Sequence, residues 1–321
     1  MSNCSAVPYR KPPLSVSDQI KKLQSRGLII NDLNKVEELL SHINYYRLEA
    51  YWYTFYDYSQ KGDHVFRPRT TFDLIWKHYC FDRRLRAHIS HALERIEISF
   101  RTQFTYYLSQ YYGPFPMEQD NFQFTANEWR IEIAGLQDIC RRSSEQFVKH
   151  FFRKYTGNVL PIWALVELQS FGAIVRYYSK ITSIHIKNQM SSVYKLTPKE
   201  LRSWLDHLCY VRNICAHHAR LWNKRLVKLP SIPQRIISIK LNQSWVQPQP
   251  PGAADNHYNE RRLFNTILII DYFLSMICPQ NNWRKELVQL IKDYSIDARR
   301  MGFPADWESD PHWTMHPDAI S

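Results

Sequence analysis

The chain has 321 residues, of which 44% are hydrophobic and 14% aromatic, and this composition excludes a largely disordered chain. It has only 8 glycines and few alternating apolar and polar runs, which favours helices over a β-sandwich or a nucleotide-binding α/β sheet. The net charge of +12 indicates a polyanionic partner, because Lys and Arg neutralise phosphates and release counterions. A basic but inert surface is the alternative interpretation.

The 6 cysteines are scattered and form no C-x-x-C pair, which is typical of a protein in a reducing cytoplasm. The first residues have no apolar core and do not indicate a signal peptide. The apolar run 263–278 is interrupted by Asn265 and Asp271. It is short for a membrane span, so it predicts a buried core helix and no membrane partner.

Helix signals dominate along the whole chain. A capping serine and Gly27 delimit a first helix, and Gly113-Pro114 ends a long one. The segment 44–59 is dense in aromatic residues and is either helical or irregular. Helices are predicted at 15–26, 31–43, 72–112, 127–155, 161–181, 183–194, 197–223, 258–278 and 283–293. The intervening segments predict a turn-rich connector at 61–70, a linker or exposed loop at 247–256 and an irregular packed tail at 301–313.

These elements predict an all-α fold with three parts. Residues 1–70 form an N-terminal helical segment, 71–225 form the core bundle, and 226–321 supply C-terminal helices and an irregular tail that pack back on the bundle. Because the last helices can complete the bundle, the boundaries between these parts are soft.

The long predicted helix carries two side-chain rows. Its apolar stripe over 85–104 has helical spacing and needs no explanation beyond packing, and Glu97 with Arg101 forms an i,i+4 pair of structural type. The other row lies within roughly 60° of the helix circumference and contains no carboxylate. This row either meets RNA or a second subunit, or is a plain solvated face: Arg84, His88, His91 and Arg95.

The segment 197–223 opens with a capping box, in which Thr197 precedes Pro198 and Glu200. Arg212 falls within the apolar stripe predicted for this helix. A guanidinium keeps its charge and is expensive to desolvate. Arg212 therefore requires a carboxylate, a group of carbonyls or a phosphate, unless the stripe faces a wet cleft.

The opposite, polar side of this helix offers an imidazole and an amide for a scissile phosphate. Asn213 lies four residues before His217 and could orient its imidazole. On an ideal helix Arg212 and His217 point about 140° apart, so the helix is distorted, or the two residues act across two subunits, or Arg212 is structural. Cys209 and Cys215 do not complete a metal-ligand spacing, and no metal or cofactor is predicted. The further candidate RNA contacts are His218, Arg220, Lys224, Arg225 and, outside this helix, Arg47.

Several stretches together resemble a known family. They are "KPPLSVSDQIKKLQSRGLII" (11–30), "INYYRLEAYW" (43–52), "FDRRLRAHISHALERIEISFRT" (81–102), "PIWALVELQSFG" (161–172), "RNICAHHARLWN" (212–223) and "MGFPADWESDPHW" (301–313). In this order they are similar to the Abi family of abortive-infection proteins, the AbiD/AbiF-like group. The combination is far more specific than an R-x-x-x-x-H motif, which alone is common by chance.

The resemblance implies an all-α protein of the HEPN superfamily, related to the HEPN ribonucleases of type VI CRISPR systems. It implies bacterial anti-phage defence, binding of a small non-coding RNA, and a metal-independent endoribonuclease site formed where two HEPN domains meet. Arg212 and His217 would be its motif pair, with Asn213 at the polar position. The competing interpretations are an RNA-binding defence protein with absent or latent cleavage, and a protein–protein module with a basic surface.

Overall fold

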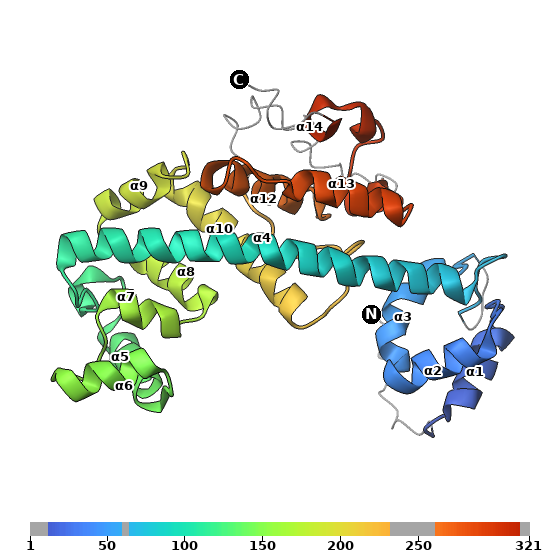
Figure 1. The fold of residues 1–321 in the computed structure, drawn as a ribbon, viewed down its shortest axis with the longest axis horizontal. Helices are drawn as coiled ribbons and strands as arrows, with labels where there is room; N and C mark the ends of the chain where they lie inside the picture. Colours follow the sequence, from blue (N-terminus) through green and yellow to red (C-terminus); the bar gives the residue numbers. More distant parts are fainter. Residues whose placement is uncertain (1–11, 60–63, 232–260, 315–321) are drawn as a thin grey trace, which may run out of the picture. The chain divides into compact units, whose positions relative to one another are not determined.

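The computed structural model describes residues 12–59, 64–231 and 261–314. Within these ranges the ordered elements are helices, with isolated β-bridges and no strand (Figure 1). The prediction of an all-α helical bundle is therefore confirmed. The chain divides into two compact units, one ending at Arg84 and the other beginning at Leu85. The proposed three-part organisation stays a prediction, and the linker expected at 247–256 lies outside the described residues.

The first unit is built from short capped helices. Ser15 accepts a hydrogen bond from the backbone N–H of Asp18, and Asp32 accepts one from that of Lys35, so each satisfies a donor of a free helix N-terminus. The aromatic segment 44–59 contains a helix followed by one 3₁₀ turn. The elements are α1 (Val16–Ser25), α2 (Leu33–His42), α3 (Tyr45–Trp52), η1 (Tyr53–Phe55) and the beginning of α4.

α4 (Phe72–Tyr112) has the bounds that the sequence predicts. It spans about 60 Å at 1.5 Å per residue, and it ends at Gly113, whose φ of 75° a residue with a side chain rarely adopts. The predicted apolar stripe over 85–104 is buried. Arg101 forms the predicted pair with Glu97 and also donates to the carbonyl of Gln169 at 2.8 Å, so this pair ties α4 to the segment before α8.

The rest of the second unit contains more helix breaks than predicted. The expected helix 127–155 is interrupted at 143–145, and the expected helix 161–181 is interrupted where Ser170 accepts from the N–H of Ala173 and starts a new helix. The elements are η2 (Gln119–Asn121), α5 (Ala126–Arg142), α6 (Gln146–Lys154), α7 (Ile162–Leu165), η3 (Val166–Leu168), α8 (Phe171–Lys180), α9 (Ile184–Ser192), α10 (Pro198–Ala216), α12 (Phe264–Ile277), α13 (Trp283–Asp293), η5 (Ala298–Met301), η6 (Trp307–Ser309) and α14 (Pro311–Thr314).

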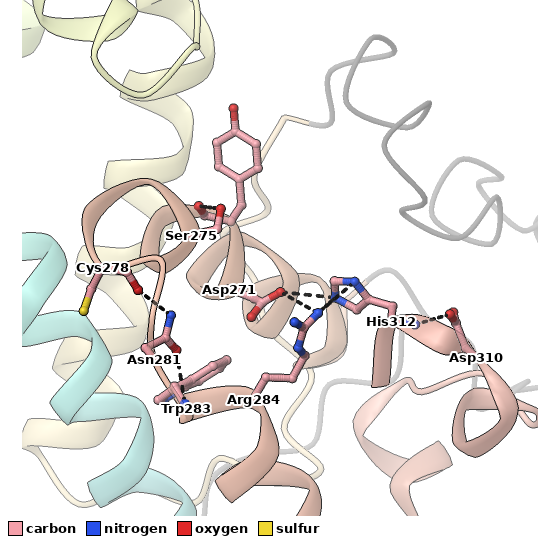
Figure 2. A network of polar contacts seen from close by, with 9 residues as sticks. Asp271, Ser275, Cys278, Asn281, Trp283, Arg284, Asp310 and His312 are labelled. Carbon is pink, nitrogen blue, oxygen red and sulfur yellow. Dashed lines mark hydrogen bonds and ion pairs between the residues drawn. The ribbon is translucent and has the colours of Figure 1, made fainter. Parts of the chain in front are cut away.

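The C-terminal helices α12 and α13 follow the apolar run and the helical pattern of the sequence. The apolar run 263–278 becomes α12, which is buried over most of its length, and α13 lies along α4 (Figure 1). Asp271 points to Arg284 and His312, with its Oδ2 3.5 Å from Arg284 Nη1 and 3.1 Å from His312 Nε2 (Figure 2). The polar interruption in the run thus anchors α13 and α14. In the described part of the chain, no helix combines the length and apolar character that a membrane crossing needs.

Candidate nucleic-acid interface

α10 is positioned by the caps at its two ends. At its start the predicted capping box is present: the Thr197 N–H donates to Glu200 Oε2 at 2.7 Å, and the Glu200 N–H donates to Thr197 Oγ1 at 3.3 Å. These reciprocal bonds satisfy donors that a helix N-terminus leaves free. Pro198 stands at the first helical position, as predicted. The beginning of the candidate helix could therefore be predicted from local sequence alone.

At its other end α10 closes in a Schellman motif. The N–H of His218 donates to the carbonyl of Cys215 at 2.9 Å, and the N–H of Ala219 donates to that of Ile214 at 3.0 Å. His218 has a φ of 55°, the left-handed conformation that this motif requires and that glycine usually provides. The backbone strain of a non-glycine residue is thus located beside the candidate catalytic histidine.

The segment after α10 is irregular, so the prediction of one helix over 197–223 is wrong for its last residues. Trp222 is fully buried and anchors the segment, and the Arg86 guanidinium donates to the carbonyl of Ala219 at 3.4 Å. Positions after His217 therefore no longer follow the helical wheel. The candidate RNA contacts here have exposed or half-exposed side chains: His218, Arg220, Lys224 and Arg225.

Arg212 is exposed, which corrects the expectation that it lies in the apolar stripe. On the helical wheel Arg212 falls at the edge of the buried arc of α10, between Leu201 and Leu205, yet its side chain is exposed. Its Nη1 is 3.5 Å from Oδ1 of Asn213, and no carboxylate pairs with it among the residues described. The guanidinium is therefore solvated rather than held in the core. The buried arc consists of Leu201, Trp204, Leu205, His207, Leu208, Val211, Ile214 and Cys215.

His217 caps the C-terminus of α10 and is exposed. Its N–H donates to the carbonyl of Asn213 at 2.9 Å, so helical hydrogen bonding continues up to this cap, and ideal helix geometry directs Arg212 and His217 about 140° apart. Helical dihedral angles end at Ala216: His217 has φ −84° and ψ 9°, and His218 is left-handed. Among the described residues the Asn213 amide makes no hydrogen bond to the His217 ring, and the expected orientation of the imidazole by this amide is absent.

His207, to which no sequence motif points, is a buried titratable side chain of α10. Its Nδ1 donates to the carbonyl of Lys228 at 2.7 Å, and its Nε2 lies 2.8 Å from Thr266 Oγ1. A carbonyl only accepts, so the proton is on Nδ1 and the Thr266 hydroxyl donates to Nε2. Burial lowers the pKa of His207 to about 4. A histidine at an apolar helical position was the signal that could have identified it.

The row on α4 does not form one continuous basic face. Arg84 is exposed and is the last residue of the first unit. The ring of His88 stacks on Trp283 of α13 and its side chain is 13% exposed, while burial lowers its pKa. His88 therefore packs against a neighbouring helix, which the row spacing could not reveal. Arg47 is half-buried on α3 of the first unit.

His91 and Arg95 remain accessible and open onto a surface pocket of about 260 Å³. The pocket lies where α4 meets the turn between α12 and α13. Its lining combines two cationic or titratable groups with amides and one carboxylate, which suits a polar ligand. The polar lining residues are His91, Arg95, Gln280, Asn281, Asn282 and Glu286.

The fold and this helix end define a class: an all-α protein that presents an R-x-x-x-x-H sequence at an exposed helix C-terminus. The family model described as Abi-like protein matches residues 38–223, which is more than half of the chain, so the chain belongs to the Abi-like protein family. The match ends directly after the "RLWN" of the motif, and the quoted stretches 11–30 and 301–313 lie outside it. No curated protein and no solved structure matches the chain. Membership in this family points to abortive infection, a form of defence against phage.

Proposed function

We propose that this chain is a bacterial, cytoplasmic abortive-infection protein that binds RNA, a small non-coding RNA in particular, and cleaves RNA without a metal at a HEPN-type site. The observation that supports this most is the end of α10. Arg212, Asn213 and His217 are all exposed there, within the residues matched by the family model. None of the three is used for packing, so a functional role explains them better than a structural one.

The chemistry assigned to this site needs one proton-transfer group and one cation. The ribose 2′-oxygen attacks the adjacent phosphorus while its proton passes to a base, and the bond to the 5′-oxygen breaks as that oxygen gains a proton. The products are a 2′,3′-cyclic phosphate and a 5′-hydroxyl. His217 is the acid or base, an effect of about 10²–10⁴-fold. Arg212 stabilises the charge on the phosphorane oxygens, and Asn213 donates a hydrogen bond.

The geometry favours a homodimer as the active form. Within one chain Arg212 and His217 diverge by about 140°, so a single copy does not direct both side chains at one phosphate. Two copies related by a two-fold axis can place one residue of each kind on either side of the substrate. A dimer through the helical bundle is the arrangement we propose.

The test compares purified wild type with His217→Ala on RNA that co-purifies with the protein and on a labelled single-stranded RNA. His42→Ala removes an exposed imidazole from α2 and is the matched control. We expect loss of cleavage in His217→Ala alone, and cyclic phosphate ends in the wild-type products. Equal cleavage by wild type and His217→Ala contradicts the catalytic assignment.

The second candidate is an RNA-binding defence ribonucleoprotein with absent or latent cleavage. The contact between the Arg212 guanidinium and the Asn213 amide at 3.5 Å favours this candidate. In this contact the guanidinium is directed to the adjacent residue and not to His217. This candidate predicts RNA in the purified protein and no cleavage by wild type. Purified protein with no bound nucleic acid, judged by its 260/280 nm absorbance ratio, would instead favour the protein–protein module.

A further inference from the structure

α6 has two sharply different faces. On its polar face, beside the neutral Gln146, the exposed side chains are cationic or titratable: Lys149, His150, Arg153 and Lys154. Its apolar face is only partly covered, because Val148 is 2% exposed while Phe147 is 40% and Tyr155 51% exposed. A surface helix normally buries its apolar face against the core. This face instead leaves aromatic edges at the surface next to a group of cations.

The charge around α6 is almost entirely positive. The last turn of α5 adds Arg141 and Arg142, whose side chains are 75% and 74% exposed and share the carboxylate of Asp138. Glu145 is the single carboxylate in 141–155. Among the described residues, none of the α6 lysines and arginines is paired with a carboxylate. Clustered like charges repel one another, and a polyanion would relieve this repulsion.

Between α5 and α6 the surface is hollowed into a pocket of about 700 Å³. Its lining includes the apolar side chains of Cys140, Val148 and Phe152 together with the exposed cations Arg141 and Lys149. A volume of this size falls in the range of small-molecule sites. The pocket therefore combines an aromatic ring, further apolar side chains and two exposed cations. Its polar lining residues are Gln137, Asp138, Ser143 and Asn158.

We infer that α5 and α6 bind single-stranded RNA, with one base in the pocket against Phe152 and its phosphates on Arg141, Lys149 and Arg153. This inference rests on the proposed RNA binding and assigns a second contact surface to it. Single-stranded nucleic acids are held by aromatic stacking combined with cations along the backbone. Gln137, Asp138 and Asn158 supply acceptors and amide donors that match the edge of a base.

The same observations disfavour a membrane as the occupant. An interfacial helix buries a continuous apolar face in the acyl region of the bilayer. Beside the aromatic residues of α6 lie the carboxylate of Asp138 and the amides of Gln137 and Asn158. These groups would lose water in lipid without gaining hydrogen-bond partners, whereas a nucleobase provides such partners.

The experiment measures binding of a fluorescently labelled oligouridylate by anisotropy across a range of salt concentrations. All proteins carry His217→Ala, so that the probe is not cleaved. The first variant is Lys149→Glu with Arg153→Glu, and the second is Phe152→Leu. Lys195→Glu with Lys199→Glu, two exposed positions near the start of α10, makes the same change in charge and is the matched control.

We expect the Lys149/Arg153 variant to bind at least tenfold more weakly, with a salt slope smaller by about 0.7 for each lost phosphate contact. Phe152→Leu should weaken binding about fivefold or more, the effect of losing one stacked base, with an unchanged salt slope. The Lys195/Lys199 control should bind within twofold of the parent protein. Circular dichroism melts establish that each variant is folded, and the charge variant carries the test if Phe152→Leu is not.

Three outcomes overturn the inference, and they differ from one another. If the parent protein does not bind the oligonucleotide, the proposed RNA binding fails and this surface fails with it. If the parent binds and the α6 variants match the Lys195/Lys199 control, only the α5–α6 surface is wrong. If the parent floats with phosphatidylserine vesicles and Lys149→Glu with Arg153→Glu abolishes flotation but not RNA binding, the surface is a membrane contact.

Discussion

The rings of His88 and Trp283 stack with their centroids 5.1 Å apart and an interplanar angle of 8°, and each residue donates a hydrogen bond to the other's backbone. His88 Nε2 donates to the Trp283 carbonyl at 2.9 Å, and Trp283 Nε1 donates to the His88 carbonyl at 3.2 Å. This reciprocal pair joins α4 to α13. His88, which the row of basic residues on α4 makes a candidate RNA contact, is thus a packing residue.

His88→Ala should destabilise the second unit, because it removes the stacked ring and leaves a buried carbonyl without its donor. We expect a loss of about 2–3 kcal/mol in the free energy of unfolding. His91→Ala, one turn further along α4 and exposed, is the control and should change stability by less than about 0.5 kcal/mol. Urea unfolding followed by circular dichroism measures both. Equal stability of His88→Ala and wild type would contradict the packing role.

His218→Gly should stabilise the protein, because His218 holds a left-handed φ of 55° that costs a residue with a side chain about 1 kcal/mol or more. After the entropy of a glycine in the unfolded chain is subtracted, we expect a gain of about 0.5 kcal/mol. Ala216→Gly, in the last regular position of α10, should instead lose about 0.5–1 kcal/mol. Thermal melts of the two glycine variants should therefore shift in opposite directions.

Local sequence signals predict the ends of some helices and fail for others. The bounds of α4 follow from its apolar stripe and from Gly113-Pro114, and the start of α10 follows from its capping box. The end of α10 was missed because its left-handed position is occupied by His218, not by glycine, and because buried residues such as Trp222 continue the apolar pattern. Nothing in the local sequence distinguishes that pattern from another helical turn.

The residues of the candidate site can be predicted from the sequence, but their burial and their contacts cannot. Whether Arg212 is buried depends on which arc of α10 is covered by its neighbours, and those helices are remote in sequence. Whether His88 is buried likewise depends on Trp283, which is almost two hundred residues away in the sequence. Helical spacing gives the relative directions of side chains on one helix, but tertiary packing decides which direction is covered.

Stability should fall at acidic pH because of His207. Its pKa is lowered to about 4 in the fold, against about 6.5 in an unfolded chain. Between these values the unfolded chain binds a proton that the folded one does not. This contribution is therefore complete above pH 6.5 and is lost as the pH drops toward 4, by about 3 kcal/mol. Burial also lowers the pKa of His88, which adds a loss of the same sign.

The variant His207→Gln separates the contribution of His207 to the acid sensitivity from that of His88. The glutamine amide can donate to the Lys228 carbonyl and accept from Thr266 Oγ1, but it does not titrate. We expect its unfolding free energy to fall less than that of wild type between pH 7.5 and pH 4.5, measured by urea titration at each pH. The same dependence in both proteins would show that other groups cause the acid sensitivity.

Removing the negative charge of Asp271 should destabilise the fold, because this carboxylate is the centre of a polar network. Asp271, Arg284 and His312 are all mostly buried, and Asp271→Asn leaves a guanidinium without its carboxylate. We expect a loss of about 2 kcal/mol, within the range for removing a charged hydrogen-bond partner. Asp293→Asn at the exposed end of α13 should cost less than about 0.5 kcal/mol. Equal losses in both variants would contradict an anchoring role for the network.

Whether Arg212 and His217 act across two copies can be decided by mixing inactive proteins. Because helix geometry directs the two side chains about 140° apart, we expect a site that takes Arg212 from one copy and His217 from the other. Arg212→Ala and His217→Ala homodimers should then both be inactive. Their heterodimer has one site with both residues intact, so an equal mixture that exchanges subunits should regain about a quarter of wild-type cleavage.

Mixing wild type with the Arg212→Ala/His217→Ala double variant gives the reciprocal result. In a shared site each heterodimer site lacks one residue, so the heterodimer is inactive and added double variant inhibits wild type. In a site built within one chain, the first mixture stays inactive, while the heterodimer with wild type keeps half of its sites. Cleavage of a labelled RNA, measured against the fraction of heterodimer from differently tagged chains, distinguishes the two arrangements, because they predict opposite behaviour in both mixtures.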